Sequence, residues 1–503
     1  MTSSSPPAVN RVSTNASDAG ASGASASHLV SSYGLLVIAN LTCQALGFVG
    51  LAVVARRVGP HDLGAYGFAN NLSSYFTLPL MAGMAVVGIR ELATADDDSR
   101  GRVVAEVQAL QVLNGVVAYV FLLALVPLLT ADPLSRALLP LTGLPLIINA
   151  AELGWAMQGM QNLRPLALYR VLGQIAYLAV LLAVLTGGAA GTERYALCNA
   201  LGFGVTTILT INYVWRRLGA RMAKTLAAPR RLFRQFGKRV RSSLAASISL
   251  TMIMIYYTMD FVLLGYLRDD YAVGEYTAAS RLPLAVTALA SLWVTVFYPH
   301  AARLFHTDRD RLRRQVGRFA TVSLLVGLPL VPLGFIMGHQ IMAALFGRAY
   351  GSSGTAFAIL LSSSAAALLN ANIGQILLAA RDDRAFLLSV TVGAILNLCL
   401  NIVLIPPLGV TGSALATLFA ECTVIALVAL RFQSTIGRIE FEWGRLIRAA
   451  FALGGTVALL LSLRSVTPWW GTLLASGVAY AILLVAVRAV MITEIRQVLR
   501  DRT

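Results

Sequence analysis

Residues 216–241 read RRLGARMAKTLAAPRRLFRQFGKRVR and hold ten basic residues and no acidic one between two long apolar stretches. Such stretches recur along the chain, and most have twenty or more residues, enough to cross a hydrocarbon layer of about 30 Å as a helix. The sequence therefore predicts an all-α integral membrane protein with about fourteen transmembrane helices. The predicted spans are roughly 29–55, 66–89, 103–129, 137–160, 166–185, 195–215, 243–267, 274–302, 319–345, 354–380, 385–406, 411–430, 449–463 and 470–487.

The forty Lys and Arg residues fall unevenly between these spans. Connections on the side of the N-terminus carry thirty-two of them, connections on the other side carry seven, and Arg281 lies within a span. Cytoplasmic loops of membrane proteins carry the excess of Lys and Arg. The sequence therefore predicts that both termini are cytoplasmic and that the membrane is a bacterial inner membrane.

Composition excludes several classes of protein. The chain is 57% hydrophobic and 13% charged, which does not fit a soluble globular protein. Its net charge of +17 lies in short loops beside the spans, where topology and anionic headgroups explain it without nucleic acid. The four cysteines lie within apolar spans and the five histidines are scattered, so the sequence predicts no disulfide framework, metal or cofactor.

Catalysis is also not expected. The connections opposite the termini are short, the longest about ten residues, and leave no room for a catalytic domain on that face. The sequence has no Walker A pattern, nucleophile elbow or HExxH motif. We therefore expect a protein that is not an enzyme.

The basic stretch divides the chain into two halves of six spans. GAYGFA at residues 64–69 and GEYTAA at residues 274–279 both place Gly-x-Tyr-x-x-Ala at the start of an even-numbered span, although so short a match also arises by chance. Halves with an even number of spans are parallel, and they can enclose a cavity and rock to give alternating access. The predicted parts are a disordered tail (1–28), an N-terminal six-helix lobe (29–218), a basic cytoplasmic linker (219–242), a C-terminal six-helix lobe (243–432), an additional helix pair (433–492) and a cytoplasmic tail (493–503).

Charged residues within spans cost about 2.5–3.5 kcal/mol each on insertion scales, so they are candidates for function. Arg281 lies about seven residues into its span, roughly 10 Å deep at 1.5 Å per residue. Asp260 is predicted at a similar depth. Arg281 either binds an anion such as phosphate, which guanidinium suits, or forms a structural pair with Asp260. The two roles are compatible if substrate competes for the arginine.

Other polar residues leave two interpretations open. Arg90 and Arg56 end spans and either extend to the interface or bind substrate. Glu152 and Glu421 are predicted within spans as coupling or proton-relay groups, or as acids satisfied by polar neighbours. Amides within spans either join helices or contact a glycan. These amides are Asn370, Asn372, Gln375, Asn397 and Asn401.

Six strings occur in the order typical of polysaccharide flippases. The chain resembles the Wzx-type oligosaccharide-lipid flippases of the multidrug/oligosaccharidyl-lipid/polysaccharide exporter superfamily over nearly all of residues 30–430, although Gln161 replaces the usual glutamate. The strings are ARRVGP with LGAY (55–66), GIRELA (88–93), WAMQGMQ (155–161), VGEYTAASRL (273–282), LFGRAY (345–350) and NLCLNIVLIPPLGVTG (397–412).

This resemblance implies a fold and a function. It implies two six-helix lobes around a cationic cavity, and translocation of polyprenyl-diphosphate-linked oligosaccharide for a cell-surface polysaccharide such as O-antigen or exopolysaccharide. Arg281, with Arg90 and Arg56, would contact the diphosphate, and Asp260 would balance charge or couple transport. Implied partners are this lipid-linked glycan, membrane lipids, and the polymerase and glycosyltransferases of the same pathway, with no nucleic acid.

The same pattern of spans is compatible with three other functions. A lipid II flippase shares fourteen spans and cavity arginines. A MATE-type drug/cation antiporter usually has twelve spans and an acidic group in the first, and the first span here has none. A polysaccharide polymerase or ligase would need a sizeable outer loop. The last two spans are predicted either to line a groove for the polyprenyl tail or to act as a peripheral anchor.

Overall fold

The computed structural model describes residues 16–77, 81–186, 191–379 and 382–489, and all of their regular elements are helical. This confirms the predicted all-α class. The elements are α1 (Ala16–Ser74), η1 (Tyr75–Thr77), α2 (Met81–Thr94), α3 (Asp97–Leu129), α4 (Pro133–Ala151), α5 (Gly154–Gly159), α6 (Leu163–Thr186), α7 (Thr192–Leu226), α8 (Pro229–Leu267), α9 (Asp270–Thr307), α10 (Arg309–Gly327), α11 (Leu330–Phe346), η2 (Arg348–Ser353), α12 (Gly354–Ala379), α13 (Asp383–Leu408), α14 (Val410–Thr435), α15 (Trp443–Leu463) and α16 (Trp469–Ala486).

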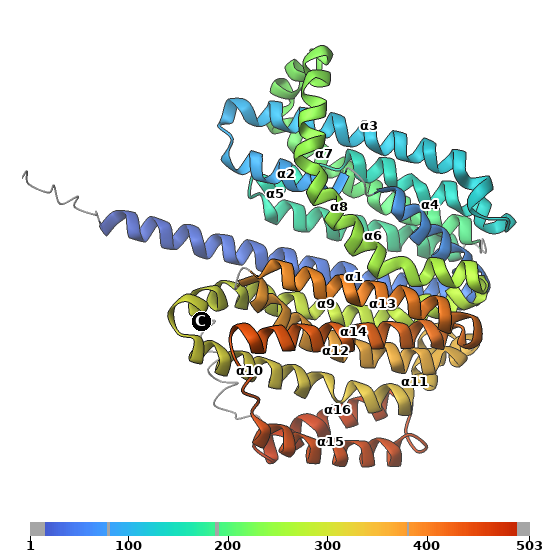
Figure 1. Ribbon diagram of the computed structural model, residues 1–503. Helices are drawn as coiled ribbons and strands as arrows, with labels where there is room; N and C mark the ends of the chain where they lie inside the picture. The colour runs from blue at the N-terminus through green and yellow to red at the C-terminus, as the bar shows by residue number, and fades with distance from the viewer. Residues whose placement is uncertain (1–15, 78–80, 187–190, 380–381, 490–503) are drawn as a thin grey trace, which may run out of the picture.

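The helices form two groups (Figure 1). Helices α3, α4, α6 and α7 pack against one another and against α1, and we call α1–α7 the N-lobe. Helices α9 and α11–α14 pack together with α10, and we call α9–α14 the C-lobe. In Figure 1 helix α8 crosses the N-lobe and reaches the C-lobe. It contacts α2 of the N-lobe and α13 of the C-lobe, and we count its C-terminal part, which holds Asp260, with the C-lobe.

Helix α1 joins the first predicted span to the start of the second through a kink. Gly59 has φ 80° and ψ 176°, a conformation that glycine adopts without penalty, and Pro60 follows it. The second predicted span is therefore divided between the end of α1, η1 and α2. At the other end, α1 continues back to Ala16, so helical backbone overlaps the tail predicted as disordered over 1–28. Alanine, which has the highest helix propensity, recurs there.

The predicted basic linker, 219–242, is largely helical. Helix α7 extends to Leu226 and α8 begins at Pro229, so Ala227 and Ala228 alone separate them. Arginine, lysine and leucine favour helix, and the basic side chains need no unfolded loop to reach water. We call the end of the bundle at this α7–α8 junction the basic face. The opposite end, with the turns at Gly59, Thr130–Asp132, Arg268–Asp269, Gly347 and Gly409, is called the short-loop face.

Among the described residues, twelve helical segments are long and apolar enough to span a membrane. The second and eighth predicted spans are not counted separately among them, so the total of fourteen stays a prediction. Helices α15 and α16 pack on each other and on α10 and α11 at the edge of the C-lobe (Figure 1). Tyr480 Oη of α16 donates to the Leu325 carbonyl at 2.8 Å.

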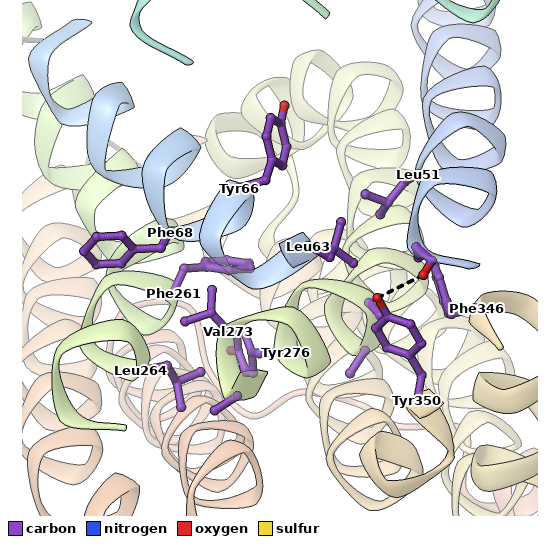
Figure 2. Close-up of a cluster of buried hydrophobic side chains, with 14 of the residues drawn as sticks. Leu51, Leu63, Tyr66, Phe68, Phe261, Leu264, Val273, Tyr276, Phe346 and Tyr350 are labelled. Atoms are coloured by element: carbon purple, nitrogen blue, oxygen red, sulfur yellow. Dashed lines mark hydrogen bonds between the residues drawn. The ribbon is translucent and has the colours of Figure 1, made fainter. Parts of the chain in front are cut away.

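The lobes share an apolar core at the short-loop face. Figure 2 shows Leu63 of α1 gathered with Phe261 of α8 and Val273 of α9, all buried. Tyr350 Oη of the C-lobe donates to the Ala55 carbonyl of the N-lobe at 3.4 Å, the dashed line in Figure 2. The lobes are therefore closed against each other at this face.

Candidate functional site

The two Gly-x-Tyr-x-x-Ala motifs lie against each other where the lobes meet. A Cβ atom on Gly64 would lie 1.5 Å from the Asp270 carbonyl oxygen and 2.8 Å from the Gly274 nitrogen. A Cβ atom on Gly274 would lie 1.8 Å from the Pro60 carbonyl oxygen. Both positions therefore require glycine for this close approach of α1 and α9.

The tyrosines of the two motifs each bond within their own lobe. Asn199 Nδ2 of α7 donates to Tyr66 Oη at 2.9 Å. Tyr276 Oη donates to Asp260 Oδ2 of α8 at 2.6 Å. The two motifs thus have the same architecture, with glycine at the contact and tyrosine turned to a polar partner away from it.

Arg281 lies on the face of α9 that meets the N-lobe. Gly274, Thr277 and Arg281 are spaced by three and four residues, which places them on one side of a helix. Thr277 Oγ1 lies 2.6 Å from the position of a Cβ on Gly67 of α1. The guanidinium interacts electrostatically with three phenol groups of the N-lobe, those of Tyr66, Tyr177 and Tyr195.

Arg281 has no ion-pair partner within the described residues, and its buried Nε has no hydrogen-bond partner there. Of the two alternatives for Arg281, the structural pair with Asp260 is not formed in this conformation. The reason is helical geometry, because Tyr276 faces Asp260 and Arg281 follows five residues later, roughly 140° around the helix. The expectation of a pair depends on the similar depth of Arg281 and Asp260 in the membrane, whereas Arg281 lies on a side of α9 that does not face Asp260.

Asp260 is hydrogen-bonded to uncharged polar groups of the C-lobe instead. Its carboxylate accepts from Tyr276 at 2.6 Å, Asn401 Nδ2 at 2.8 Å and Thr417 Oγ1 at 3.0 Å. Asn397 adjoins this network through Asn401. A buried carboxylate with three donors is a stable structural centre, and it also borders a small cavity of about 70 Å³.

The other C-lobe candidates form a second network. Glu421 Oε1 accepts from Tyr256 Oη at 3.2 Å, and its Oε2 accepts from Asn370 Nδ2 at 3.3 Å. Asn372 donates to Ser323 Oγ and to the Leu368 carbonyl. The Gln375 side chain lies outside the described residues. The described amides thus join helices in this conformation, and their glycan contacts stay a prediction.

A larger polar cavity lies inside the N-lobe, between α1, α4, α6 and α7. Its volume is about 290 Å³. Amides, hydroxyls and both signs of charge line it, an unusual composition for helices at membrane depth. The lining residues are Asn40, Cys43, Asn149, Glu152, Arg170, Gly173, Gln174, Tyr177, Asn199, Gly202, Phe203, Thr206 and Thr207.

Glu152 lies at a break in the fourth predicted span. Helix α4 ends at Ala151 and α5 begins at Gly154. Thr210 Oγ1 accepts from the Leu153 backbone nitrogen at 3.3 Å, whereas Glu152 Oε1 is buried without a hydrogen-bond partner within the described residues. Non-helical backbone at membrane depth is tolerated where it lines a cavity, and Glu152 does so here.

Arg170 is the charged cavity residue that is not among the candidates predicted from the sequence. It is counted there with the cytoplasmic connections, although the predicted span 166–185 contains it. In α6 its Nη1 donates to Asn40 Oδ1 at 3.2 Å. Its guanidinium also interacts electrostatically with Glu152. The sequence does contain a pattern that indicates this polar face, because Arg170, Gln174 and Tyr177 are spaced by four and three residues on one face of an apolar helix.

The other two predicted arginines lie at opposite ends of the bundle. Arg56 crosses between the lobes at the short-loop face, where Nε donates to the Leu345 carbonyl at 2.9 Å and Nη2 donates to the Ala344 carbonyl. It thus caps the C-terminal end of α11, where positive charge is favourable. Arg90 is exposed on α2 near the basic face.

Helix α8 contacts the N-lobe near the basic face. Arg239 of α8 bonds Glu91 Oε2 at 2.8 Å and Glu106 Oε2 at 2.6 Å. A Cβ on Gly83 of α2 would lie 2.5 Å from the Ser243 carbonyl oxygen of α8. Arg281 and the N-lobe cavity therefore lie between this α8 contact and the closure of the lobes at the short-loop face.

The fold and the polar cavities define a multi-pass membrane protein of two helical lobes. A solved structure titled "Lipid II flippase MurJ, inward closed conformation" has the same fold, with a TM-score of 0.71 and 12% identity over 89% of this chain and 97% of that one. An inward-facing MATE family transporter of the MOP superfamily matches with a TM-score of 0.55 and 13% identity over 80% of this chain and 94% of that one.

The chain belongs to the family described as polysaccharide biosynthesis protein, whose sequence model matches residues 29–305. This confirms the predicted resemblance to polysaccharide exporters. A "Probable flippase AglR" of Haloferax volcanii is 29% identical over 35% of this chain and 38% of its own length. A "Probable low-salt glycan biosynthesis flippase Agl15" of the same organism is 24% identical over 38% of this chain and 40% of its own length. The matches thus span about two fifths of these curated relatives.

Proposed function

We propose that this protein is a flippase that moves a polyprenyl-diphosphate-linked oligosaccharide across the membrane. The observation that carries the proposal is Arg281, a cation at the interface of two lobes with no ion-pair partner within the described residues. A charge at membrane depth is costly and is retained where it serves a substrate. The names of the two relatives and the family support a glycan substrate.

The proposed mechanism is alternating access of the two lobes. In the present conformation α1 and α9 close the short-loop face, so loading occurs from the basic face once the Arg239 contacts part. A diphosphate then reaches Arg281, whose planar guanidinium binds phosphate oxygens in pairs. Separation of α1 from α9 then opens the short-loop face.

Arg90 and Arg56 have distinct places in this proposal. Arg90 is exposed near the basic face and would meet the incoming headgroup first. Arg56 is held by the α11 carbonyls and becomes free for an anion only when the short-loop face opens. The three arginines thus form a path for diphosphate along the lobe interface.

The buried acids are proposed as coupling groups. Asp260 and Glu421 lie in hydrogen-bonded networks of the C-lobe, and Glu152 borders the N-lobe cavity. A proton or cation taken up by one of them would change the charge of its lobe during the cycle.

We further propose that the basic face is cytoplasmic, by the excess of Lys and Arg on it. The relatives come from an archaeon, so the proposed location is the cytoplasmic membrane rather than a bacterial inner membrane specifically. Its partners there would be membrane lipids and the glycosyltransferases and polymerase of the same glycan pathway. Transport rather than catalysis is the proposed role.

A lipid II flippase-like function is the second candidate, and the shared fold with such a flippase favours it. Depletion separates the two functions. When the protein is depleted, lipid-linked glycan precursors accumulate on the inner leaflet, and their sugars identify the cargo. Accumulation of lipid II would replace the proposed oligosaccharide, and unchanged levels of every lipid-linked sugar would contradict a flippase of either kind.

A further inference from the structure

The N-lobe cavity differs from the C-lobe networks in what its amides do. Asn149 of α4 and Gln174 of α6 line it, and their side chains have no hydrogen-bond partner among the described residues. In the C-lobe, the amides of Asn370 and Asn401 donate to carboxylates. Polar groups within a membrane protein are normally bonded to one another, so two unengaged amides facing one cavity indicate a ligand with complementary groups.

Charge in the cavity favours a neutral polar ligand. Arg170 and Glu152 both line it, and they form no salt bridge in the part of the chain that the structure describes. A small anion would meet the carboxylate of Glu152, and a small cation would meet the guanidinium of Arg170. Hydroxyl groups can donate to the Glu152 carboxylate, which lines the cavity, and accept from Arg170, which uses one nitrogen for Asn40.

The volume of the cavity and its aromatic residues further limit which class of ligand it can bind. A volume of 290 Å³ corresponds to about ten waters, the room that about a dozen heavy atoms occupy. One pyranose ring has that size, and the further sugars of an oligosaccharide would extend beyond the cavity. Tyr177 and Phe203 add ring faces among the polar groups, and aromatic rings pack against the apolar C–H face of a sugar.

The cavity is adjacent to the proposed diphosphate group. Tyr177 lines the cavity, and its ring centroid lies 6.3 Å from that of Tyr195, which lies 4.4 Å from that of Tyr66 beside the α1–α9 contact. Arg281 follows Thr277 by one turn on the face of α9 that meets this part of α1. A diphosphate at Arg281 would therefore place the sugar attached to it beside Tyr177. Gln174 and Arg170 continue along the same face of α6 toward the basic face.

We propose that the N-lobe cavity is a subsite for a single pyranose residue, the sugar bonded directly to the diphosphate. Asn149, Gln174, Arg170 and Glu152 hydrogen-bond its hydroxyl or amide groups, and Tyr177 packs against the ring. This inference rests on the proposed function, since the lipid-linked diphosphate delivers the sugar. Selection of the cargo then depends on the first sugar rather than on the outer ones.

Cys43 lies in this cavity and reports its occupancy. The test uses the full chain in nanodiscs with Cys198→Ala, Cys399→Ala and Cys422→Ala, so that Cys43 is the remaining thiol. The rate of its modification by a small methanethiosulfonate reagent is measured with polyprenyl diphosphate and with the same carrier bearing one N-acetylglucosamine. At about ten times its dissociation constant, the sugar-bearing carrier should slow modification about tenfold, and the bare carrier should leave the rate unchanged.

Matched variants separate the cavity from the rest of the protein. Asn149→Leu with Gln174→Leu keeps the approximate volume but removes the amides, so protection by the sugar should disappear. Asn212→Leu, on α7 outside the cavity, should retain it. Equal modification rates with and without the sugar, or protection that survives Asn149→Leu with Gln174→Leu, would overturn the subsite.

Transport of the same two carriers is measured in parallel. If both are flipped and Cys43 is never protected by the sugar, the subsite is wrong and the flippase proposal stands. If neither is flipped and neither protects Cys43, both proposals fail. A Cys43 thiol that does not react without ligand also contradicts the subsite, because the cavity would then be closed to solutes.

Discussion

Gly64 and Gly274, 210 residues apart in sequence, face each other across the two lobes so closely that neither position has room for a methyl group. Each glycine belongs to a copy of the same short motif. The contact joins backbone to backbone, so no flexible side chain can move aside to relieve a clash. It therefore acts as a spacer that sets how tightly the short-loop face closes.

Gly64→Ala should weaken this closure. The new methyl group would meet the Asp270 carbonyl at 1.5 Å, and overpacking of this kind costs about 1–3 kcal/mol. We expect thiol reagents to reach cysteines placed at the short-loop face faster than in the parent protein. Gly204→Ala is the control, because a Cβ there meets nothing within 4 Å. Equal accessibility in the Gly64 and Gly204 variants would contradict the spacer role.

Arg239 should stabilise the contact near the basic face. Its side chain is 15% exposed and that of Glu106 is 7% exposed, so Arg239→Gln leaves a buried carboxylate without its partner. Breaking such a pair costs about 3 kcal/mol. The melting temperature in detergent should fall, and Glu106→Gln added to Arg239→Gln should restore part of it. A double variant less stable than the single one would show that the charge pair is not the cause.

The short-loop closure should depend on pH through Asp270. The pKa of this carboxyl is raised by burial and by Asp132 of the other lobe, against the lowering effects of His61 and of the nearby Ser135 hydroxyl. Asp269 beside it also raises the pKa. Because opening removes the burial and separates Asp270 from Asp132, the closed form binds the proton more tightly. Closure is therefore favoured as pH falls through the raised pKa, above the ordinary aspartate value of about 3.9.

The predicted direction of this pH dependence can be tested by measuring the accessibility of cysteines at the short-loop face as the external pH is changed. Accessibility should decrease with acidification in the parent protein, and Asp270→Asn should make it low at every pH. Glu193→Gln, an exposed acid on the same face, should keep the parent's dependence. An increase in accessibility on acidification would reverse the predicted sign and reject the role of Asp270.

Helices α15 and α16 test where the polyprenyl tail lies. They pack on α10 and α11, outside the two lobes, and an alkyl tail exposed to water costs about 0.8 kcal/mol per CH₂. If the pair lines a groove for the tail, a protein truncated before Trp443 should insert stably but flip slowly. Transport at the parent rate by a stably inserted truncation would leave α15 and α16 as a peripheral anchor.

Apolar runs of sufficient length predicted most of the helices, because a membrane span is decided locally by length and hydropathy. The motif at Gly64 and Gly274 was also visible in the sequence, although its meaning as a contact was not. The direction of Arg281 was missed, since depth in the membrane says nothing of which side of a helix a residue occupies. Its spacing from Gly274 and Thr277 carries that information only once the contact of α1 with α9 is known.

The N-lobe cavity was harder to predict. Arg170 lies close enough to the start of α6 to resemble a loop residue, and its partners Asn40 and Glu152 come from α1 and from the break between α4 and α5. The basic linker was predicted as a loop because charge marks the edge of a span, yet charged residues favour helix and continue it beyond the membrane. Local sequence therefore predicts spans well and the surroundings of polar side chains poorly.

Arg281 is proposed to bind the diphosphate of a lipid-linked glycan, and the transport mechanism depends on this contact. The most direct measurement compares Arg281→Ala, Arg281→Lys and Arg464→Ala in proteoliposomes with a fluorescent polyprenyl-diphosphate sugar, scoring affinity and flipping. Loss of a charge-assisted phosphate contact costs about 1.5–3 kcal/mol, so Arg281→Ala should bind roughly 10- to 150-fold more weakly. Arg281→Lys should recover part of this, because it keeps the charge but not the planar fork, and Arg464→Ala should behave as the parent. Parent affinity and flipping in a stably inserted Arg281→Ala protein would contradict the account.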